Sequence, residues 1–135
     1  MKCMIDANII LDVLSKRKPY YEDSAKIWKL CETNKIKGYI SVLSFADIVY
    51  ILRKELDSEQ IQIVLSGLKL IFNFTELQPE DLFNAAELKW DDFEDTIQET
   101  SAKRIKAEYI ITRNIKDFKN SSLKVYSPSE FLKLI

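Results

Sequence analysis

The chain contains 135 residues, of which 47% are hydrophobic and 30% charged, with a formal net charge of -1 and no histidine. A chain of this length can bury one sizeable core, so we expect residues 1–135 to form a single domain. The lack of histidine excludes Ser-His-Asp triads, Cys-His pairs and histidine-bound zinc, which leaves carboxylates, hydroxyls and lysines for any chemistry. A net charge this close to zero also argues against a protein that coats nucleic acid by bulk electrostatics.

Cysteine content and the length of apolar runs predict where the protein resides. Cys3 and Cys31 are too few for a disulfide scaffold or a four-cysteine zinc site. No apolar run approaches the ~20 residues that span a bilayer, and the N-terminal residues do not resemble a signal peptide. We therefore expect a cytoplasmic protein with reduced thiols and no membrane segment.

The first part of the chain alternates between strand and helix patterns. Residues 2–6 form a short apolar strand that ends in Asp6, and Asn8 is the expected N-cap of the helix that follows. Apolar side chains then recur at helical spacing over residues 21–35. A β-rich stretch at residues 38–42 leads directly into a third helical pattern.

The middle of the chain continues this alternation. Asp57 is the expected cap of a fourth helix with apolar positions at residues 61–68, and a strand should follow around either residues 70–72 or Phe74. Residues 79–90 form a further short helix that begins with proline.

The last part of the chain has the same character. An acidic stretch at residues 91–95 begins a helix whose Phe93 and Ile97 are expected to face inward. Strands are predicted at residues 108–112 and 125–126, and a capping box at residues 127–130 begins a terminal helix. The complete order of strands and helices predicts an α/β fold with a parallel sheet between helical layers.

Acidic and polar side chains follow several of the predicted strands. Asp6, Asp47, Asp95 and Asp117 arise from separate segments that can reach the same edge of a parallel sheet. Clustered carboxylates repel one another unless a cation neutralises them, and Mg²⁺ or Mn²⁺ prefers oxygen ligands of this kind. Two such ions can support phosphodiester cleavage without a histidine base. The sequence therefore predicts metal-assisted phosphodiester hydrolysis.

Four motifs occur in a fixed order along nearly the whole chain. They are Ile5-Asp6-Ala7-Asn8, Ser41 through Asp47, Asp92-Phe93-Glu94-Asp95, and Thr112-Arg113-Asn114-Ile115-Lys116-Asp117-Phe118. Together they resemble PIN-domain nucleases, including the VapC-type toxins of toxin–antitoxin modules. The first and last motifs are the specific ones.

This resemblance implies a fold, an activity and a set of partners. It implies a three-layer α/β/α fold with a central parallel sheet of four to five strands. The activity it implies is that of an endoribonuclease dependent on Mg²⁺ or Mn²⁺, acting as the toxin of a type II toxin–antitoxin module. It implies RNA as the substrate, a cognate antitoxin protein and a homodimer. The catalytic residues it implies are Asp6, Asp47, Asp95 and Asp117, with Asp6, Asp95 and Asp117 as metal ligands and with Asn8, Thr112 and Asn114 in support. Arg113 is the cation we expect to contact an RNA phosphate.

Other interpretations of the same residues are open at this point. Asp6 could only cap its helix, Asp47 could close a capping box with Ser44, and Asp117 could be a turn residue. The family more often has glutamate at the position of Asp47, and many members have aspartate at that of Asn114. These departures favour one alternative function, a catalytically weak PIN-like module that binds protein.

Overall fold

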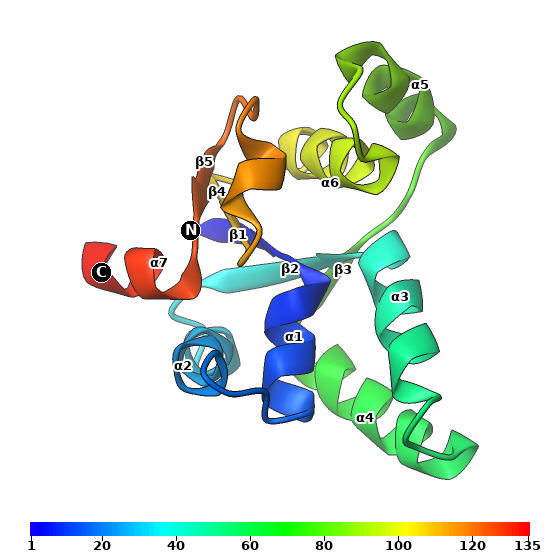
Figure 1. Cartoon of the computed structure of the whole chain (residues 1–135), viewed down its shortest axis with the longest axis vertical. Coiled ribbons are helices and arrows are strands. Elements are labelled where there is room, and N and C mark those ends of the chain that lie inside the picture. Colours follow the sequence, from blue (N-terminus) through cyan, green and yellow to red (C-terminus); the bar gives the residue numbers. More distant parts are fainter.

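The structure, a computed structural model, describes all 135 residues and contains one five-stranded sheet (Figure 1). All neighbouring strands are parallel, in the order β3-β2-β1-β4-β5. The strands are β1 (Lys2–Ile5), β2 (Lys37–Ser41), β3 (Asn73–Thr75), β4 (Tyr109–Ile111) and β5 (Lys124–Tyr126). The chain moves outward from β1 to β3 and then resumes on the other side of β1 with β4, so the strand order reverses between β1 and β4.

Helices cover both faces of this sheet. They are α1 (Ala7–Leu14), α2 (Tyr21–Glu32), α3 (Val42–Leu52), α4 (Ser58–Ile71), α5 (Pro79–Leu88), α6 (Phe93–Arg104), the 3₁₀ helix η1 (Ile115–Phe118) and α7 (Pro128–Leu134). Buried side chains of α1 to α4 and α7 join a large apolar cluster, whereas those of α6 and η1 join a smaller one. Figure 1 shows α5 and α6 together, apart from α1, α2 and α4. The expected three-layer α/β/α fold is confirmed.

Side chains of the central strands alternate between the two layers. On β1, Cys3 and Ile5 lie in the large cluster, while Met4 lies in the small one. On β4, Ile111 belongs to the large cluster and Ile110 to the small one. This period of two explains why both strands are apolar throughout, because each of their faces is covered.

Two predictions about these elements need correction. β3 lies at Asn73–Thr75, so the alternative around Phe74 is confirmed and the one at residues 70–72 is wrong. Leu70 belongs to α4 and is 88% exposed, because the helical repeat places it on the solvent side. Phe93, expected to face inward, is 48% exposed at the first turn of α6.

The buried face of α6 is mainly polar, which the apolar pattern did not predict. Ser101 and Glu99 are both buried there. The Glu99 carboxylate accepts hydrogen bonds from the Ser121 and Ser122 hydroxyls and from the Ser122 amide. Its burial is therefore compensated by hydrogen bonds from the loop that leads to β5.

No helix of the structure is sufficiently long and apolar to cross a membrane. The starts of α4 and α7 agree with the capping signals in the sequence. Ser127 and Glu130 form the expected capping box at the start of α7, and Asp57 forms one with Gln60 at the start of α4.

The two glycines give a matched test of this packing. A Cβ atom added to Gly38 of β2 would lie 2.5 Å from Cys31 Sγ and 3.1 Å from a ring carbon of Phe72. A Cβ atom added to Gly67 of α4 would have no neighbour within 4 Å. We expect Gly38→Ala to lower the free energy of unfolding by about 1–3 kcal/mol through overpacking. Gly67→Ala should raise it by about 0.5–1 kcal/mol, because alanine favours the helix. Urea unfolding of both variants checks this, and equal effects would contradict the packing described here.

Candidate active site

The four predicted acids line one groove at the carboxyl-terminal edge of the sheet. The groove has a volume of about 520 Å³, and its walls include Asp6, Asp47, Asp95 and Asp117. They come from the β1–α1 junction, α3, α6 and η1, respectively. The groove lies where the strand order reverses, which is the usual position of a ligand site in an open parallel sheet.

Asp6 is held by hydrogen bonds to both of its carboxylate oxygens. Oδ1 accepts from the Ala7 amide at 2.8 Å, and Oδ2 accepts from the Thr112 hydroxyl at 2.6 Å. The Asn8 side-chain amide lies 3.4 Å from Asp6 Oδ2 and from Thr112 Oγ1. Thr112 directly follows β4, the neighbour of β1, so strand pairing places its hydroxyl beside Asp6.

The N-cap of α1 is Asp6, so the expectation that Asn8 caps this helix is wrong. Helix α1 begins at Ala7, and Asn8 lies inside its first turn. The side-chain NH₂ group of Asn8 is thus available to the Asp6–Thr112 pair. Its side-chain oxygen accepts a hydrogen bond from the backbone amide of Arg113 at 3.4 Å. Capping by Asp6 is compatible with a second role, because only one carboxylate oxygen is used for it.

Burial is the largest influence on Asp6 and raises the pKa of its carboxyl. The hydrogen bonds from Thr112 and Ala7 lower this pKa, while the negative charge of Asp117 raises it further. The net direction is upward, so the fold holds a carboxylate where its charged form is disfavoured. A nearby cation would reverse that preference.

Asp95 lies in the first turn of α6, as its sequence predicted. Asp92 caps this helix, since its Oδ1 accepts from the amides of Glu94 and Asp95. Burial, followed by the charges of Asp92, Asp6, Asp117 and Glu94, raises the pKa of Asp95 to about 7. The electrostatic effects of Asp6 and Asp117 show that the three predicted metal ligands influence one another across the groove.

Asp47 does not close a capping box, so that interpretation is wrong. Ser41 caps α3, and its hydroxyl oxygen accepts from the Ser44 amide. Asp47 therefore lies in the second turn of α3, and it lines the groove together with Glu94. Burial, and then the negative charge of Asp47, raise the pKa of Glu94.

Glu94 was not among the predicted site residues. The acidic run at the start of α6 is typical of a favourable helix terminus, and this ordinary explanation concealed Glu94. Helical periodicity gave no signal for it, because consecutive residues such as Glu94 and Asp95 point in directions about 100° apart on a helix. Both nevertheless line the groove, since α6 presents its N-terminal end to it.

Asp117 and Asn114 reach the groove from the segment around η1. The Asp117 amide donates to the Asn114 carbonyl at 3.0 Å, and the Asp117 side chain is exposed and has no hydrogen bond to its own backbone. The turn-residue interpretation is therefore not supported. The backbone amide of Asn114 in turn donates a hydrogen bond to the Thr112 hydroxyl at 3.0 Å.

Arg113 lies close to the site but is bound to a residue that was not singled out. Its Nε and Nη2 donate to the two carboxylate oxygens of Asp12 at 2.8 and 3.0 Å. The expected contact of Arg113 with an RNA phosphate stays a prediction. Asp12 lies within the apolar run of α1, and a single acid in such a run was the available signal that it is buried and paired.

The donor set suits a hard divalent cation. All the candidate ligands are carboxylate or amide oxygens, which Mg²⁺ and Mn²⁺ prefer. No group of three or more Asp, Glu, Cys or His side chains has a geometry that could by itself hold a metal ion. The groove thus contains mutually repelling oxygen donors rather than a preformed coordination shell.

Burial of Asp95 and repulsion from its neighbours lead to a prediction about stability in EDTA. The Asp95 carboxyl ionises near pH 3.8 in the unfolded chain but at about pH 7 in the folded protein, so the free energy of unfolding must fall as pH rises through this interval. Asp95→Asn removes this loss and should stabilise the protein at pH 7.5 by about 1 kcal/mol, a value reduced for solvent screening of a half-buried group. Urea unfolding at pH 5 and 7.5 measures it. A stabilisation that does not increase with pH would contradict the assignment.

Comparison with known proteins gives one family and a consistent fold. A family model described as PIN domain matches residues 2–116. Ribonuclease VapC1 of Aquifex aeolicus (strain VF5) is 27% identical over 138 residues, with 96% of this chain and 92% of that protein covered.

Solved structures show the same fold at lower identity. VapBC2 from Rickettsia felis, bound to a DNA fragment from its promoter, has a TM-score of 0.71 at 21% identity, covering 94% of this chain and 98% of the other. FitAcB from Neisseria gonorrhoeae has a TM-score of 0.72 at 16% identity with the same coverage of 94% and 98%. VapC20 from Mycobacterium tuberculosis, a toxin that cleaves the sarcin-ricin loop, has a TM-score of 0.65 at 10% identity, covering 80% and 86%.

Proposed function

Because this chain belongs to the PIN domain family, we propose that it is an endoribonuclease that hydrolyses RNA phosphodiester bonds with Mg²⁺ or Mn²⁺. The observation that carries the proposal is the meeting of Asp6, Asp47, Asp95 and Asp117 in one groove, where mutual repulsion favours a bound cation. The ribonuclease named among its relatives supports the same activity. We further propose that the chain acts in the cytoplasm as the toxin of a type II toxin–antitoxin module.

In this proposal Asp6, Asp95 and Asp117 hold the divalent ion. Such an ion, when bound, activates a water molecule and stabilises the leaving oxygen of the phosphodiester. Thr112 and Asn8 orient Asp6 through the hydrogen bonds described above. Asn114 supports this arrangement, because its backbone amide donates a hydrogen bond to the Thr112 hydroxyl.

Asp47 and Glu94 form the other side of the groove. Both residues line the groove, and burial together with the negative charge of Asp47 raises the pKa of the Glu94 carboxyl. This pair can accept or return a proton at the edge of the metal site. Asp47 thus orients water or binds the ion through a water molecule, and Glu94 compensates for the shorter reach of aspartate at this position.

Cations flank the acidic groove and are suited to RNA phosphates. Arg17 and Lys54 line the groove itself. An adjoining hollow of about 410 Å³ shares Asp95 and Asp117 with it and is also lined by Lys89, Lys116 and Lys119. A single RNA strand can therefore cross the acids with phosphates near positive charge on either side.

We propose a cognate antitoxin protein as the partner and a homodimer as the assembly. Solved structures of similar fold include toxin–antitoxin complexes, among them one from Klebsiella pneumoniae. Several large apolar side chains are exposed on this single chain, including Ile63 at 74% and Phe83 at 73%. Co-purification with the product of the adjacent gene, and light scattering of the separated protein, test these two proposals.

The alternative function is a PIN-like module that binds protein and has weak catalysis. The lack of a preformed coordination shell and the aspartate at position 47 favour it. Titration calorimetry with Mn²⁺ separates the two functions, because a module without a metal site should give no binding heat.

The charge-neutral substitution Asp6→Asn tests the proposed activity directly. It should lower manganese-dependent cleavage of RNA by more than about 100-fold, because a neutral amide oxygen binds the ion more weakly than a charged carboxylate does. Asparagine is also a good N-cap, so helix α1 should remain folded. The assay uses a panel of tRNAs and unstructured RNAs with Mn²⁺ and with EDTA.

Glu59→Gln is the matched control, since Glu59 is exposed on α4 and outside the groove. It makes the same change of charge and should retain full activity. Undiminished cleavage by Asp6→Asn would exclude the proposed mechanism.

The flanking lysines make a separate prediction about RNA binding. In an Asp6→Asn background, Lys116→Gln with Lys119→Gln should weaken binding of a single-stranded RNA and reduce the slope of log K against log salt by about 1.4, at about 0.7 per phosphate contact. The same double change at Lys26 and Lys29 of α2 serves as control, because neither residue lines the groove or the adjoining hollow. Fluorescence anisotropy measures both slopes. An equal slope change in the two pairs would show that Lys116 and Lys119 do not contact the RNA.

A further inference from the structure

The salt bridge between Asp12 and Arg113 is the most completely buried charge pair near the groove. The Asp12 side chain is 0% exposed and that of Arg113 is 22% exposed. Asp12 accepts a third hydrogen bond from the Ser24 hydroxyl at 3.1 Å, and the Tyr20 ring lies 3.9 Å from the guanidinium carbon of Arg113. One carboxylate therefore joins α1, α2 and the segment that follows β4.

This pair is connected to Asp6 through Asn8 and Thr112. Asn8 and Asp12 are four residues apart and share one face of α1. Asn8 binds the backbone amide of Arg113, and Asp12 binds its guanidinium, so α1 holds this residue at two points. The preceding residue, Thr112, donates the 2.6 Å hydrogen bond to Asp6.

We propose that the Asp12–Arg113 pair is a positioning device for the metal site: it fixes Thr112 and Asn8 so that the Asp6 carboxylate faces the groove in one orientation. The proposal rests on the proposed function, because it assigns Asp6 to the ion. Asp12 and Arg113 are positioning residues in this scheme, since their mutual bonds use both carboxylate oxygens and two guanidinium nitrogens.

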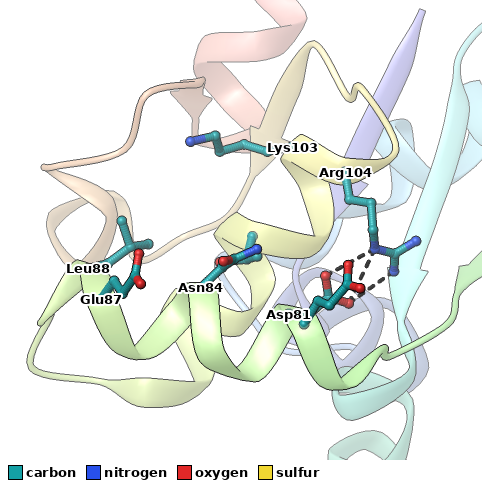
Figure 2. Close-up of a pocket in the computed structure, with 8 residues that line it drawn as sticks. Asp81, Asn84, Glu87, Leu88, Lys103 and Arg104 are labelled. Carbon is teal, nitrogen blue, oxygen red and sulfur yellow. Dashed lines mark hydrogen bonds and ion pairs between the residues drawn. The ribbon is translucent and has the colours of Figure 1, made fainter.

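The chain supplies a second buried pair that separates positioning from simple stabilisation. Asp81 of α5 and Arg104 of α6 have side chains that are 2% and 27% exposed, and Arg104 donates to both carboxylate oxygens (Figure 2). Asp81 also accepts one further hydrogen bond, from the Gln78 amide. This pair matches the first in chemistry and burial.

The second pair differs from the first in its location. It lines a groove of about 490 Å³ between α5 and α6 that contains none of the four predicted acids. Arg104 is nine residues beyond Asp95 on α6, which is roughly 13 Å along the helix axis at about 1.5 Å per residue. Breaking it should disturb folding to a similar degree without reaching Asp6.

The experiment compares Asp12→Asn and Arg113→Lys with Asp81→Asn and Arg104→Lys. The lysine variants keep the charge but lose the forked hydrogen bonds, and they serve if an asparagine variant does not fold. For each protein we would measure the urea midpoint, the Mn²⁺ dissociation constant by calorimetry, and hydrogen exchange of the Arg113 and Asn114 amides without metal.

All four variants should lower the urea midpoint. Only Asp12→Asn and Arg113→Lys should weaken Mn²⁺ binding, by about 10-fold or more as expected for groups that orient metal ligands. The same two should speed exchange of the Arg113 and Asn114 amides, which donate to Asn8 and Thr112.

Equal Mn²⁺ affinity and equal amide protection in the two pairs of variants would overturn the proposal. This result is distinct from failure of the proposed function, in which the unsubstituted protein itself binds no Mn²⁺ and cleaves no RNA. In that case unequal amide protection still supports the positioning of Thr112 and Asn8 by the buried pair.

Discussion

Mutual repulsion of carboxylates at one edge of the sheet is the constraint on which the rest of this structure depends. Burial is the largest cause of the raised pKa of Asp95, and the charges of Asp6 and Asp117, which lie on other elements, raise it further. Bringing them together costs free energy in the folded protein without a cation. The fold must therefore hold them in place by other interactions, and it does so with hydrogen bonds and buried ion pairs around the groove.

The two sides of the sheet contribute differently to this support. The layer of α1 to α4 and α7 has a large apolar cluster and can anchor β1 and the start of α1. The opposite layer has a small apolar cluster and relies on polar contacts, such as those of Glu99 with Ser121 and Ser122 and of Arg104 with Asp81. Satisfied polar contacts fix orientation more narrowly than apolar packing does. The helix that carries Asp95 is thus placed by directional bonds.

The proposed chemistry follows from this placement. An ion held by Asp6, Asp95 and Asp117 relieves their repulsion, so binding of the ion and stability of the fold are linked. Glu94 extends the acidic surface toward Asp47, and lysines of the adjoining hollow provide the opposite charge for a phosphate backbone. In the proposed function a nearly neutral chain binds a polyanion locally, which its net charge does not reveal.

The sequence by itself determined the alternation of strands and helices, the helix caps at Asp57 and Ser127, and the identity of four of the acids that line the groove, namely Asp6, Asp47, Asp95 and Asp117. Apolar periodicity, capping and strand-end position are local properties, and a family resemblance adds the order of motifs. Only the tertiary structure decided that Asp6 caps α1, that Glu94 joins Asp47, and that Asp12 is buried against Arg113. These contacts depend on the orientation of whole elements, because residues 101 positions apart in the chain meet only when β1 pairs with β4.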